Sequence, residues 1–340
     1  MRKSVTIQDI ANALGLSRNT VSKALNGQYV PAKTREIVLR KARELNYKSF
    51  NAGVLTSKKY RILLLSGKPF HNISFFLPLV RGIENHCYDN NYDFFQYVYN
   101  PATTSFWVIA DHIKSLNIDG IVAIECFDPL FINELLKLGY PTCFIDFPGY
   151  QFDPVDKFDL VCTSDQKSVC AYAKEMILKQ KVHRLSFVGD FRHCLSFHER
   201  YMGMLRALAR TGLSHRKEDD ILENDESFDY GSVESLKEKI AAIHHLPECF
   251  ICCNDFVARK VADALKELGY QIPQDTFVVG FDGVTASESG SPAITTFYVN
   301  KEALGIEAIR ALIHRIEHKD SPTKTIMMDC DLIVRESSHR

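Results

Sequence analysis

The chain has 340 residues, of which 46% are hydrophobic and 24% charged, so it can form two or three globular domains with sizeable cores. No apolar run approaches the roughly 18 residues of a membrane-spanning helix, and the N-terminal sequence MRKSVTIQDIANALG lacks the apolar stretch of a secretory signal. All ten cysteines follow residue 86, a distribution unlike a disulfide framework, and we therefore expect a cytoplasmic protein.

The net charge of −1 conceals a separation of charge along the chain. Residues 1–60 contain twelve Lys and Arg against three acidic residues, a net charge of +9, whereas the remaining residues carry a net charge of −10. A basic segment joined to an acidic body indicates a polyanionic partner. The alternative, a basic disordered tail, is disfavoured by helical patterning and capping residues in this segment.

The basic segment shows three short amphipathic helices. The first follows a capping residue, Thr6, and ends at Gly15. The second covers residues 18–25, and the third runs from Pro31 to about residue 46. The three-residue, glycine-containing turn between the first two helices predicts a helix-turn-helix.

The second helix presents only basic and neutral polar side chains on its outer face: Arg18, Asn19, Ser22 and Lys23. Arg and Lys can donate to guanine, and Asn can pair with adenine, in the DNA major groove. A merely solvated helix would usually carry acidic residues as well, so we favour a DNA-reading helix.

The sequence VTIQDIANALGLSRNTVSKALNG, followed by TREIVLRKARELNY, resembles the DNA-binding head of the lactose/galactose repressor (LacI/GalR) family. The resemblance implies that Arg18, Asn19 and Lys23 read bases. It also implies phosphate contacts, which set register rather than sequence preference. The residues at those positions are Thr6, Ser17, Thr20, Ser22, Asn26 and Tyr47.

Residues 48–60 join the head to the rest of the chain. In the resembling family this hinge becomes a helix on DNA and wedges a leucine into the minor groove, which makes Leu55 the candidate here. The segment departs from the family pattern, because the usual Ala-Arg pair is absent and Gly53 weakens a helix. A flexible basic linker is therefore the alternative.

From residue 61 onward, short apolar runs alternate with amphipathic helical patterns, which predicts an α/β fold with parallel sheets. The expected strands are 62–66, 93–97, 120–124, 142–147, 185–189, 249–253 and 277–281. The expected helices lie near 76–90, 104–116, 130–138, 166–180, 198–212, 232–245 and 256–268.

So many strands favour two Rossmann-like lobes, and the order of motifs resembles the periplasmic-binding-protein-like core of the same family. The expected domains are a head (1–47), a hinge (48–60) and an effector-binding and dimerisation domain (61–340). We expect lobe one to comprise about 61–161 and 293–322, and lobe two about 162–292 and 323–340.

Several polar residues stand directly after apolar strands, where ligands bind in such folds. The resemblance implies effector contacts by Asp146, Arg200, Phe228, Asn254, Asp282 and Phe75. Carboxylates, an amide and a guanidinium beside an aromatic ring suit a polyhydroxylated ligand. We therefore expect a repressor with a helix-turn-helix head, controlled by a small polar effector, a sugar or sugar phosphate.

Other functions find less support in the sequence. A two-lobed sugar kinase or epimerase would need a phosphate-binding loop, but Ser66-Gly67-Lys68 lacks the upstream glycine of that motif. The CxxC at Cys249 and Cys252 lies in an apolar strand, which favours burial over zinc or redox chemistry. A transporter's solute-binding protein would need a signal peptide. We expect no catalytic residues, metal or cofactor, and as partners near-palindromic operator DNA and a second copy of the chain.

Overall fold

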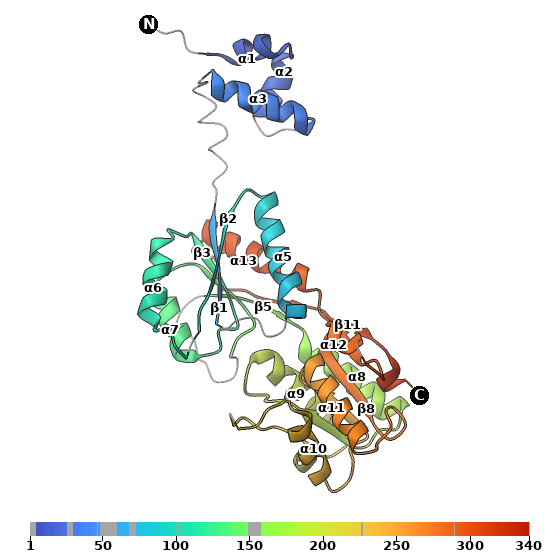
Figure 1. The fold of residues 1–340 in the computed structure, drawn as a ribbon. Coiled ribbons are helices and arrows are strands. Elements are labelled where there is room, and N and C mark those ends of the chain that lie inside the picture. Colours follow the sequence, from blue (N-terminus) through green and yellow to red (C-terminus); the bar gives the residue numbers. More distant parts are fainter. Residues whose placement is uncertain are drawn as a thin grey trace. The chain divides into compact units, whose positions relative to one another are not determined.

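A computed structural model describes residues 5–25, 30–45, 47, 60–67, 73–100, 102–148, 158–225, 227–288 and 290–339 (Figure 1). The chain forms two compact units, Met1–Lys59 and Tyr60–Arg340. Asn26 and Leu55 lie outside the described residues, as does most of the predicted hinge. The domain boundaries at residues 47 and 60 therefore remain predictions.

The N-terminal unit contains the three helices α1 (Ile7–Leu14), α2 (Arg18–Leu25) and α3 (Ala32–Glu44). Helix α1 begins with the capping box that its sequence predicts: the amide of Asp9 donates to Thr6 Oγ1 over 3.3 Å, and the amide of Thr6 donates to Asp9 Oδ2 over 2.8 Å. It ends at Gly15, whose φ of +64° is left-handed. The buried core of this unit is formed by Ile10, Ala11, Val21, Ala24, Leu25, Val38 and Ala42.

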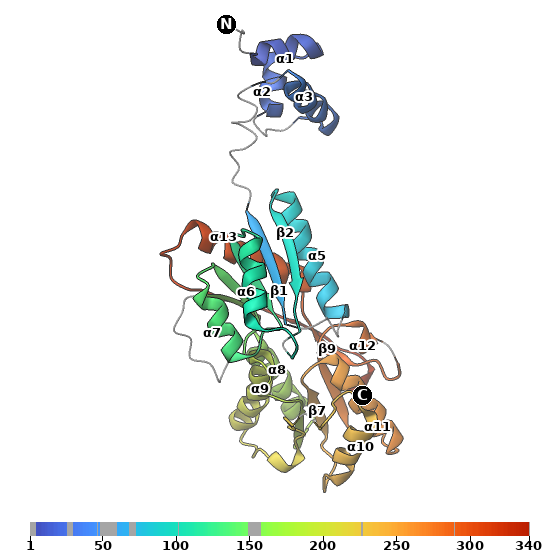
Figure 2. The same cartoon turned by 60° about the vertical axis from the view of Figure 1, so that its left-hand side comes forward.

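The second unit contains two sheets, each the centre of one lobe (Figures 1 and 2). The sheet of lobe one has the order β10-β5-β4-β3-β1-β2, and all its strands are parallel. These strands are β1 (Arg61–Ser66), β2 (Asp93–Val98), β3 (Gly120–Ile124), β4 (Thr142–Ile145), β5 (Asp159–Thr163) and β10 (Thr325–Met328).

Helices cover both faces of this sheet: α5 (Ile73–Asp89) and α13 (Lys301–Glu317) pack on one face, α6 (Phe106–Ser115) and α7 (Pro129–Lys137) on the other. Alternate residues of β1 accordingly enter different cores, Ile62 and Leu64 on the α5 side and Leu63 and Leu65 on the α6 side. Burial on both faces explains why these strands are apolar runs rather than alternating patterns.

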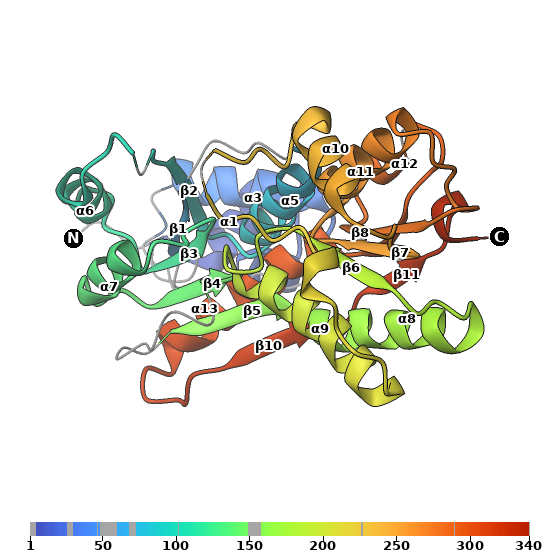
Figure 3. The same cartoon turned by 90° about the horizontal axis from the view of Figure 1, so that it is seen from below.

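The sheet of lobe two has the order β11-β9-β8-β7-β6. Its strands are β6 (Leu185–Val188), β7 (Cys249–Cys252), β8 (Phe277–Asp282), β9 (Thr295–Tyr298) and the antiparallel β11 (Asp331–Ile333). Helices α8 (Asp165–Lys179) and α9 (Leu195–Thr211) lie on one face, and α10 (Val233–Ala242) and α11 (Asp255–Glu267) on the other (Figure 3). The short elements are η2 (Lys217–Asp219), α12 (Thr285–Glu288) and η3 (Glu336–Ser338).

The chain passes between the lobes in three crossing segments: between β5 and α8, between β9 and α13, and between β10 and β11. This corrects the expected lobe composition. Strand β9 belongs to the second sheet, although we expected residues 293–322 in lobe one, and β10 pairs with β5 in the first sheet, although we expected 323–340 in lobe two. The second and third crossings therefore come later in the chain than expected, because β9 and β10 each add a strand to the lobe that the chain then leaves.

All seven predicted strands and seven predicted helices of this unit are present, with ends shifted by a few residues. The structure adds β5, β9, β10, β11 and the long helix α13. Among the described residues, no helix combines the length and apolarity that crossing a membrane requires.

Candidate ligand cavity and nucleic-acid interface

A cavity lies between the lobes, at the carboxyl ends of strands from both sheets. Such ends collect polar residues, because each strand stops there and its loop faces the opposing lobe. Lobe one contributes Phe75, Phe76, Ile124, Glu125, Phe127, Ile145, Asp146, Val161, Cys162, Thr163 and Leu304. Lobe two and the second crossing contribute His193, Cys194, Ser196, Phe197, Arg200, Asn254, Asp282 and Val299.

Five of the six predicted effector residues line this cavity: Phe75, Asp146, Arg200, Asn254 and Asp282. The sixth, Phe228, is not among its lining residues. The Phe228 ring packs edge-on against Tyr230, with 4.8 Å between ring centres, and the Lys239 amine lies 5.7 Å from its centre.

Three acidic residues at strand ends share an uncommon backbone conformation. Glu125 follows β3, Asp146 follows β4 and Asp282 ends β8, with φ angles of +55°, +61° and +97°. Left-handed backbone is costly for a residue with a side chain and is found where the surrounding structure enforces it, often at ligand sites. All three line the cavity, and Glu125 is not among the residues predicted from the sequence.

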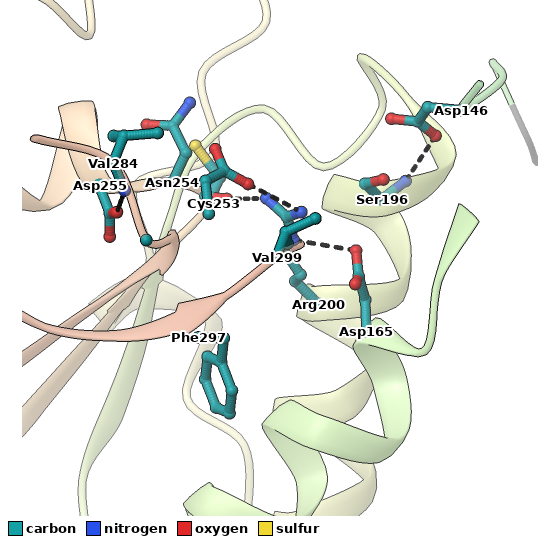
Figure 4. A network of polar contacts seen from close by, with 12 residues as sticks. Asp146, Asp165, Ser196, Arg200, Cys253, Asn254, Asp255, Val284, Phe297 and Val299 are labelled. Atoms are coloured by element: carbon teal, nitrogen blue, oxygen red, sulfur yellow. Dashed lines mark hydrogen bonds and ion pairs between the residues drawn. The ribbon is translucent and has the colours of Figure 1, made fainter. Parts of the chain in front are cut away.

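Asp146 connects the two lobes through its carboxylate (Figure 4). Its Oδ1 accepts hydrogen bonds from the amide of Phe147 over 2.8 Å and from the amide of Ser196 over 3.1 Å. Ser196 lies in the first turn of α9, where unpaired amides favour a negative charge. The Asp146 carboxylate therefore joins the end of β4 in lobe one to the start of α9 in lobe two.

Arg200 lies at the centre of a buried ionic network in lobe two (Figure 4). Its Nε donates to Asp165 Oδ2 over 3.0 Å, its Nη2 lies 3.4 Å from Asp282 Oδ1, and its Nη1 donates to the carbonyl of Cys253. The guanidinium carbon lies 3.7 Å from the centre of the Phe281 ring, a cation–π contact. The guanidinium therefore holds the ends of β7 and β8 together beside the cavity.

Burial raises the pKa of both carboxyl groups in this network. The pKa of Asp165 rises to about 6, although the positive charge of Arg200 opposes the rise. The pKa of Asp282 is also raised by burial, against the opposing charges of Arg200 and Lys301. Burial alone would lower the pKa of Arg200, but the charges of Asp165 and Asp282 raise it, so the guanidinium stays protonated.

Asn254 is held by a helix cap. Its Oδ1 accepts from the amide of Val257 over 2.9 Å and caps α11, which leaves the side-chain NH₂ as the donor available to a ligand. Cys162 and Cys194 also line the cavity, and burial raises the pKa of the Cys162 thiol to about 12 and that of Cys194 well above its ordinary value. Both thiols are protonated at neutral pH and act there as small apolar groups.

Aromatic rings reach the cavity from both lobes. Phe75 and Phe76 of α5 pack edge-on, with 5.4 Å between ring centres. Phe127 of lobe one meets His193 of lobe two at 4.9 Å, and His193 lies 5.8 Å from Phe197. Phe127 and His193 lie in loops and Phe197 in the first turn of α9, and none of them belongs to a sequence pattern that predicts a cavity residue.

On the N-terminal unit, the three predicted base readers are exposed along α2: Arg18, Asn19 and Lys23. Two predicted phosphate contacts cap helices: Thr6 caps α1, and Ser17 Oγ accepts from the amide of Thr20 over 3.0 Å. Ser22 and Tyr47 are half-buried, and Tyr47 packs against the core of the unit. Helix α2 thus has one buried face and one cationic face, as a recognition helix requires.

Both parts of the chain match families of known proteins. Residues 6–49 match the family described as "Bacterial regulatory proteins, lacI family", and residues 175–338 match the "Periplasmic binding protein-like domain". The HTH-type transcriptional repressor PurR of Pasteurella multocida is 26% identical over 345 residues, covering 98% of each protein.

Two solved structures share the fold. The transcriptional regulator CelR in complex with cellobiose has a TM-score of 0.72 at 20% identity, with 98% of this chain and 99% of that chain covered. The lac repressor dimer bound to operator and the anti-inducer ONPF has a TM-score of 0.68 at 19% identity, with 99% and 100% covered. The chain therefore carries a DNA-binding domain of the lacI family and a periplasmic-binding-protein-like domain.

Proposed function

We propose that the chain is a cytoplasmic repressor that binds near-palindromic operator DNA as a homodimer and changes its DNA affinity when a small neutral sugar occupies the cavity between its lobes. The observation that carries the proposal is the set of three acidic strand ends, Glu125, Asp146 and Asp282, around one interlobe cavity. A site shared by two lobes can bias their relative angle, provided that the ligand binds one arrangement more tightly. The proposed base-reading residues and phosphate contacts of the head account for the proposed binding to operator DNA.

The chemistry of the cavity favours a ligand with hydroxyl groups. Carboxylates accept hydrogen bonds from hydroxyls, the Asn254 amide can donate to them, and the rings of Phe75 and Phe127 offer apolar faces for the carbon side of a sugar ring. In support, a protein of the same fold has been solved with the disaccharide cellobiose.

The charge of the residues that line the cavity favours neutral sugars over sugar phosphates as ligands. The guanidinium of Arg200 already faces Asp165 and Asp282, so its charge is neutralised within the protein. Asp146 adds negative charge to the same lining. A phosphate would meet repulsion from these carboxylates, since Arg200 is the one arginine or lysine among the described lining residues and is already paired. We therefore narrow the expectation of a sugar or sugar phosphate to a neutral sugar.

A flat nitrogen heterocycle is the second candidate, because the aromatic lining also suits stacking and a carboxylate can accept from ring N–H groups. The two candidates differ in how they use the carboxylates. A sugar needs several of them as hydrogen-bond acceptors, whereas a heterocycle needs one or two.

A thermal-shift screen of the full chain separates these classes. The panel contains neutral mono- and disaccharides, the corresponding sugar phosphates, and nucleobases with their nucleosides. A ligand at about 100 times its Kd stabilises by about 2.7 kcal/mol, which raises the melting temperature by several degrees in a domain of this size. The shift should disappear in Asp146→Asn and persist in Asp111→Asn, an exposed acid on α6.

Each result of the screen has a defined meaning. Shifts by sugar phosphates alone would refute the charge argument, and shifts by nucleobases alone would select the second candidate. A ligand whose shift survives Asp146→Asn would bind elsewhere.

A DNA-binding assay tests the other part of the proposal. The full chain should bind a site selected from random DNA with steep salt dependence, and a chain starting at residue 60 should not bind it.

A further inference from the structure

Lys301 presents a buried amine at the second crossing between the lobes. It is the first residue of α13, directly after the segment that leaves β9, and only 5% of its surface is exposed. Its Nζ donates to three main-chain carbonyls: that of Asp282, that of Gly283 over 3.2 Å and that of Val299 over 3.1 Å. Within the described part of the chain, no carboxylate lies within ion-pair distance of this amine.

Two of these carbonyls converge because of an unusual turn. In a regular strand, successive carbonyls point to opposite sides, so one amine could not reach both. Asp282 and Gly283 have φ angles of +97° and +64°, and this pair of left-handed residues turns both carbonyls toward Lys301. Gly283 also packs against Tyr298, whose main chain would lie 2.9 Å from an added Cβ. The amine thus stabilises a backbone that Asp282 adopts only at a cost.

The backbone of Lys301 belongs to lobe one, whereas two of its three carbonyl partners belong to lobe two. Helix α13 is locked onto α5 by close approach: a Cβ at Gly82 would lie 2.4 Å from the carbonyl oxygen of Glu302, and one at Gly305 would lie 2.6 Å from that of Leu79. The start of α13 therefore cannot shift independently of α5. The Lys301 amine reaches from this fixed point to the end of β8.

The amine also lies between two cavity residues of opposite lobes. The Phe75 ring centre is 5.9 Å from Nζ on the lobe-one side, and the Asp282 carbonyl is bonded on the lobe-two side. The Tyr298 ring centre, at 4.9 Å, covers the amine near the crossing. A change in the lobe angle must alter these contacts, because they join groups carried by different lobes.

We propose that Lys301 is a positioning residue of the cavity: it holds the Asp282–Gly283 turn and ties it to α13, so that the position of the Asp282 carboxylate and the angle between the lobes depend on this amine. The proposal rests on the proposed function for its biological meaning, since the cavity is taken as the effector site. Lys301 itself does not line the cavity.

The test compares Lys301→Met, which keeps the length of the side chain but removes the donors, with the full wild-type chain. Single-molecule energy transfer between labels at exposed positions 114 of α6 and 238 of α10 reports the interlobe distance without DNA or ligand. Hydrogen exchange reports local opening in the same samples. Lys167→Met is the matched control, because Lys167 joins Asp329 at another crossing, at 2.9 Å, on the exposed surface.

We expect Lys301→Met to broaden the distance distribution. Amides 282–284 and those of the first turn of α13 should exchange roughly 5- to 100-fold faster, as the loss of hydrogen bonds to buried carbonyls implies. Lys167→Met should match wild type in both measurements. If Lys301→Met does not fold, Lys301→Gln takes its place: its donors sit one atom short of the Nζ position, so both measurements should change in the same direction by a smaller amount.

An unchanged distance distribution would overturn the proposal, even if exchange rose evenly over both lobes, because that pattern belongs to a merely stabilising residue. The measurement needs neither DNA nor effector. A failure of the proposed function in the thermal-shift screen or the DNA assay therefore leaves this test intact, and the reverse also holds.

Discussion

Replacing Arg200 by methionine tests the buried network that supports the cavity. The side chain is almost fully buried, and its removal leaves Asp165 without its ion-pair partner, Asp282 with the charge of Lys301 alone and the Cys253 carbonyl without the Arg200 donor. Breaking a buried ion pair by removing one partner costs about 3–5 kcal/mol. That is a large share of the roughly 5–15 kcal/mol by which a domain is stable. Arg200 is thus a structural residue as well as a proposed ligand contact.

The stability lost in Arg200→Met should be larger at high pH than at low pH. The folded-state pKa of Asp165 is already raised to about 6, and removal of the positive charge raises it further. A carboxyl group whose folded pKa exceeds its unfolded pKa binds more protons when folded, so stability falls as pH rises between the two values. Arg200→Met should therefore lose less stability at pH 5, where Asp165 can be protonated, than at pH 7.5.

Urea unfolding followed by circular dichroism at both pH values measures the effect. The control is Arg206→Met on the same helix, because Arg206 is exposed and donates to Gln166, over 2.9 Å. Adding Asp165→Asn to Arg200→Met should recover part of the loss at pH 7.5. An Arg200→Met midpoint equal to that of Arg206→Met, or an equal loss at both pH values, would refute the role assigned to the network.

Three further predictions concern the head and the fold. Arg18→Ala should cost about 1–3 kcal/mol on a selected DNA site and relax base preference at one position, whereas Lys33→Ala, which removes the same charge from α3, should leave the preference unchanged in a binding-site selection. Tyr47→Phe should weaken binding to all sites alike, which titration of several selected sites would show. Burial raises the pKa of Asp255 to about 7, so wild type should lose about 2–3 kcal/mol more stability between pH 5 and 7.5 than Asp255→Asn; equal pH slopes in denaturant unfolding would contradict this.

The sequence predicts the elements whose own residues show a clear pattern of burial. Strands such as β3 are apolar at every position because both faces are covered, and the amphipathic helices between them fix the parallel connections. The edge strands β10 and β11 were missed because their side chains are half exposed and their runs are short. Helix α13 was missed although Leu304, Ala308 and Leu312 recur at a helical spacing, a signal that was present in the sequence.

The residues of the candidate site also differ in whether the local sequence predicts them. Asp146, Asn254 and Asp282 are predictable because each follows an apolar strand, a position that the local sequence reveals. Asp165 and Lys301 are not, because their roles arise from contacts with Arg200 and with the end of β8, made across the fold between distant segments. Phe228 was assigned by resemblance alone, and its ring packs on Tyr230 rather than lining the cavity.

The backbone at the strand ends connects these contacts to function. A glycine at Glu125, Asp146 or Asp282 would adopt the observed left-handed conformation without strain, whereas a residue with a side chain is destabilised there by about 1–3 kcal/mol. The fold therefore places three carboxylates where stability alone favours their absence. Asp146 accepts a hydrogen bond from the start of α9, and Asp282 is held by Arg200 and Lys301. Strain that is stabilised from both lobes and ends in acidic groups facing one cavity supports the proposed ligand site between the lobes, because a ligand bound by those groups would give the strained residues a function.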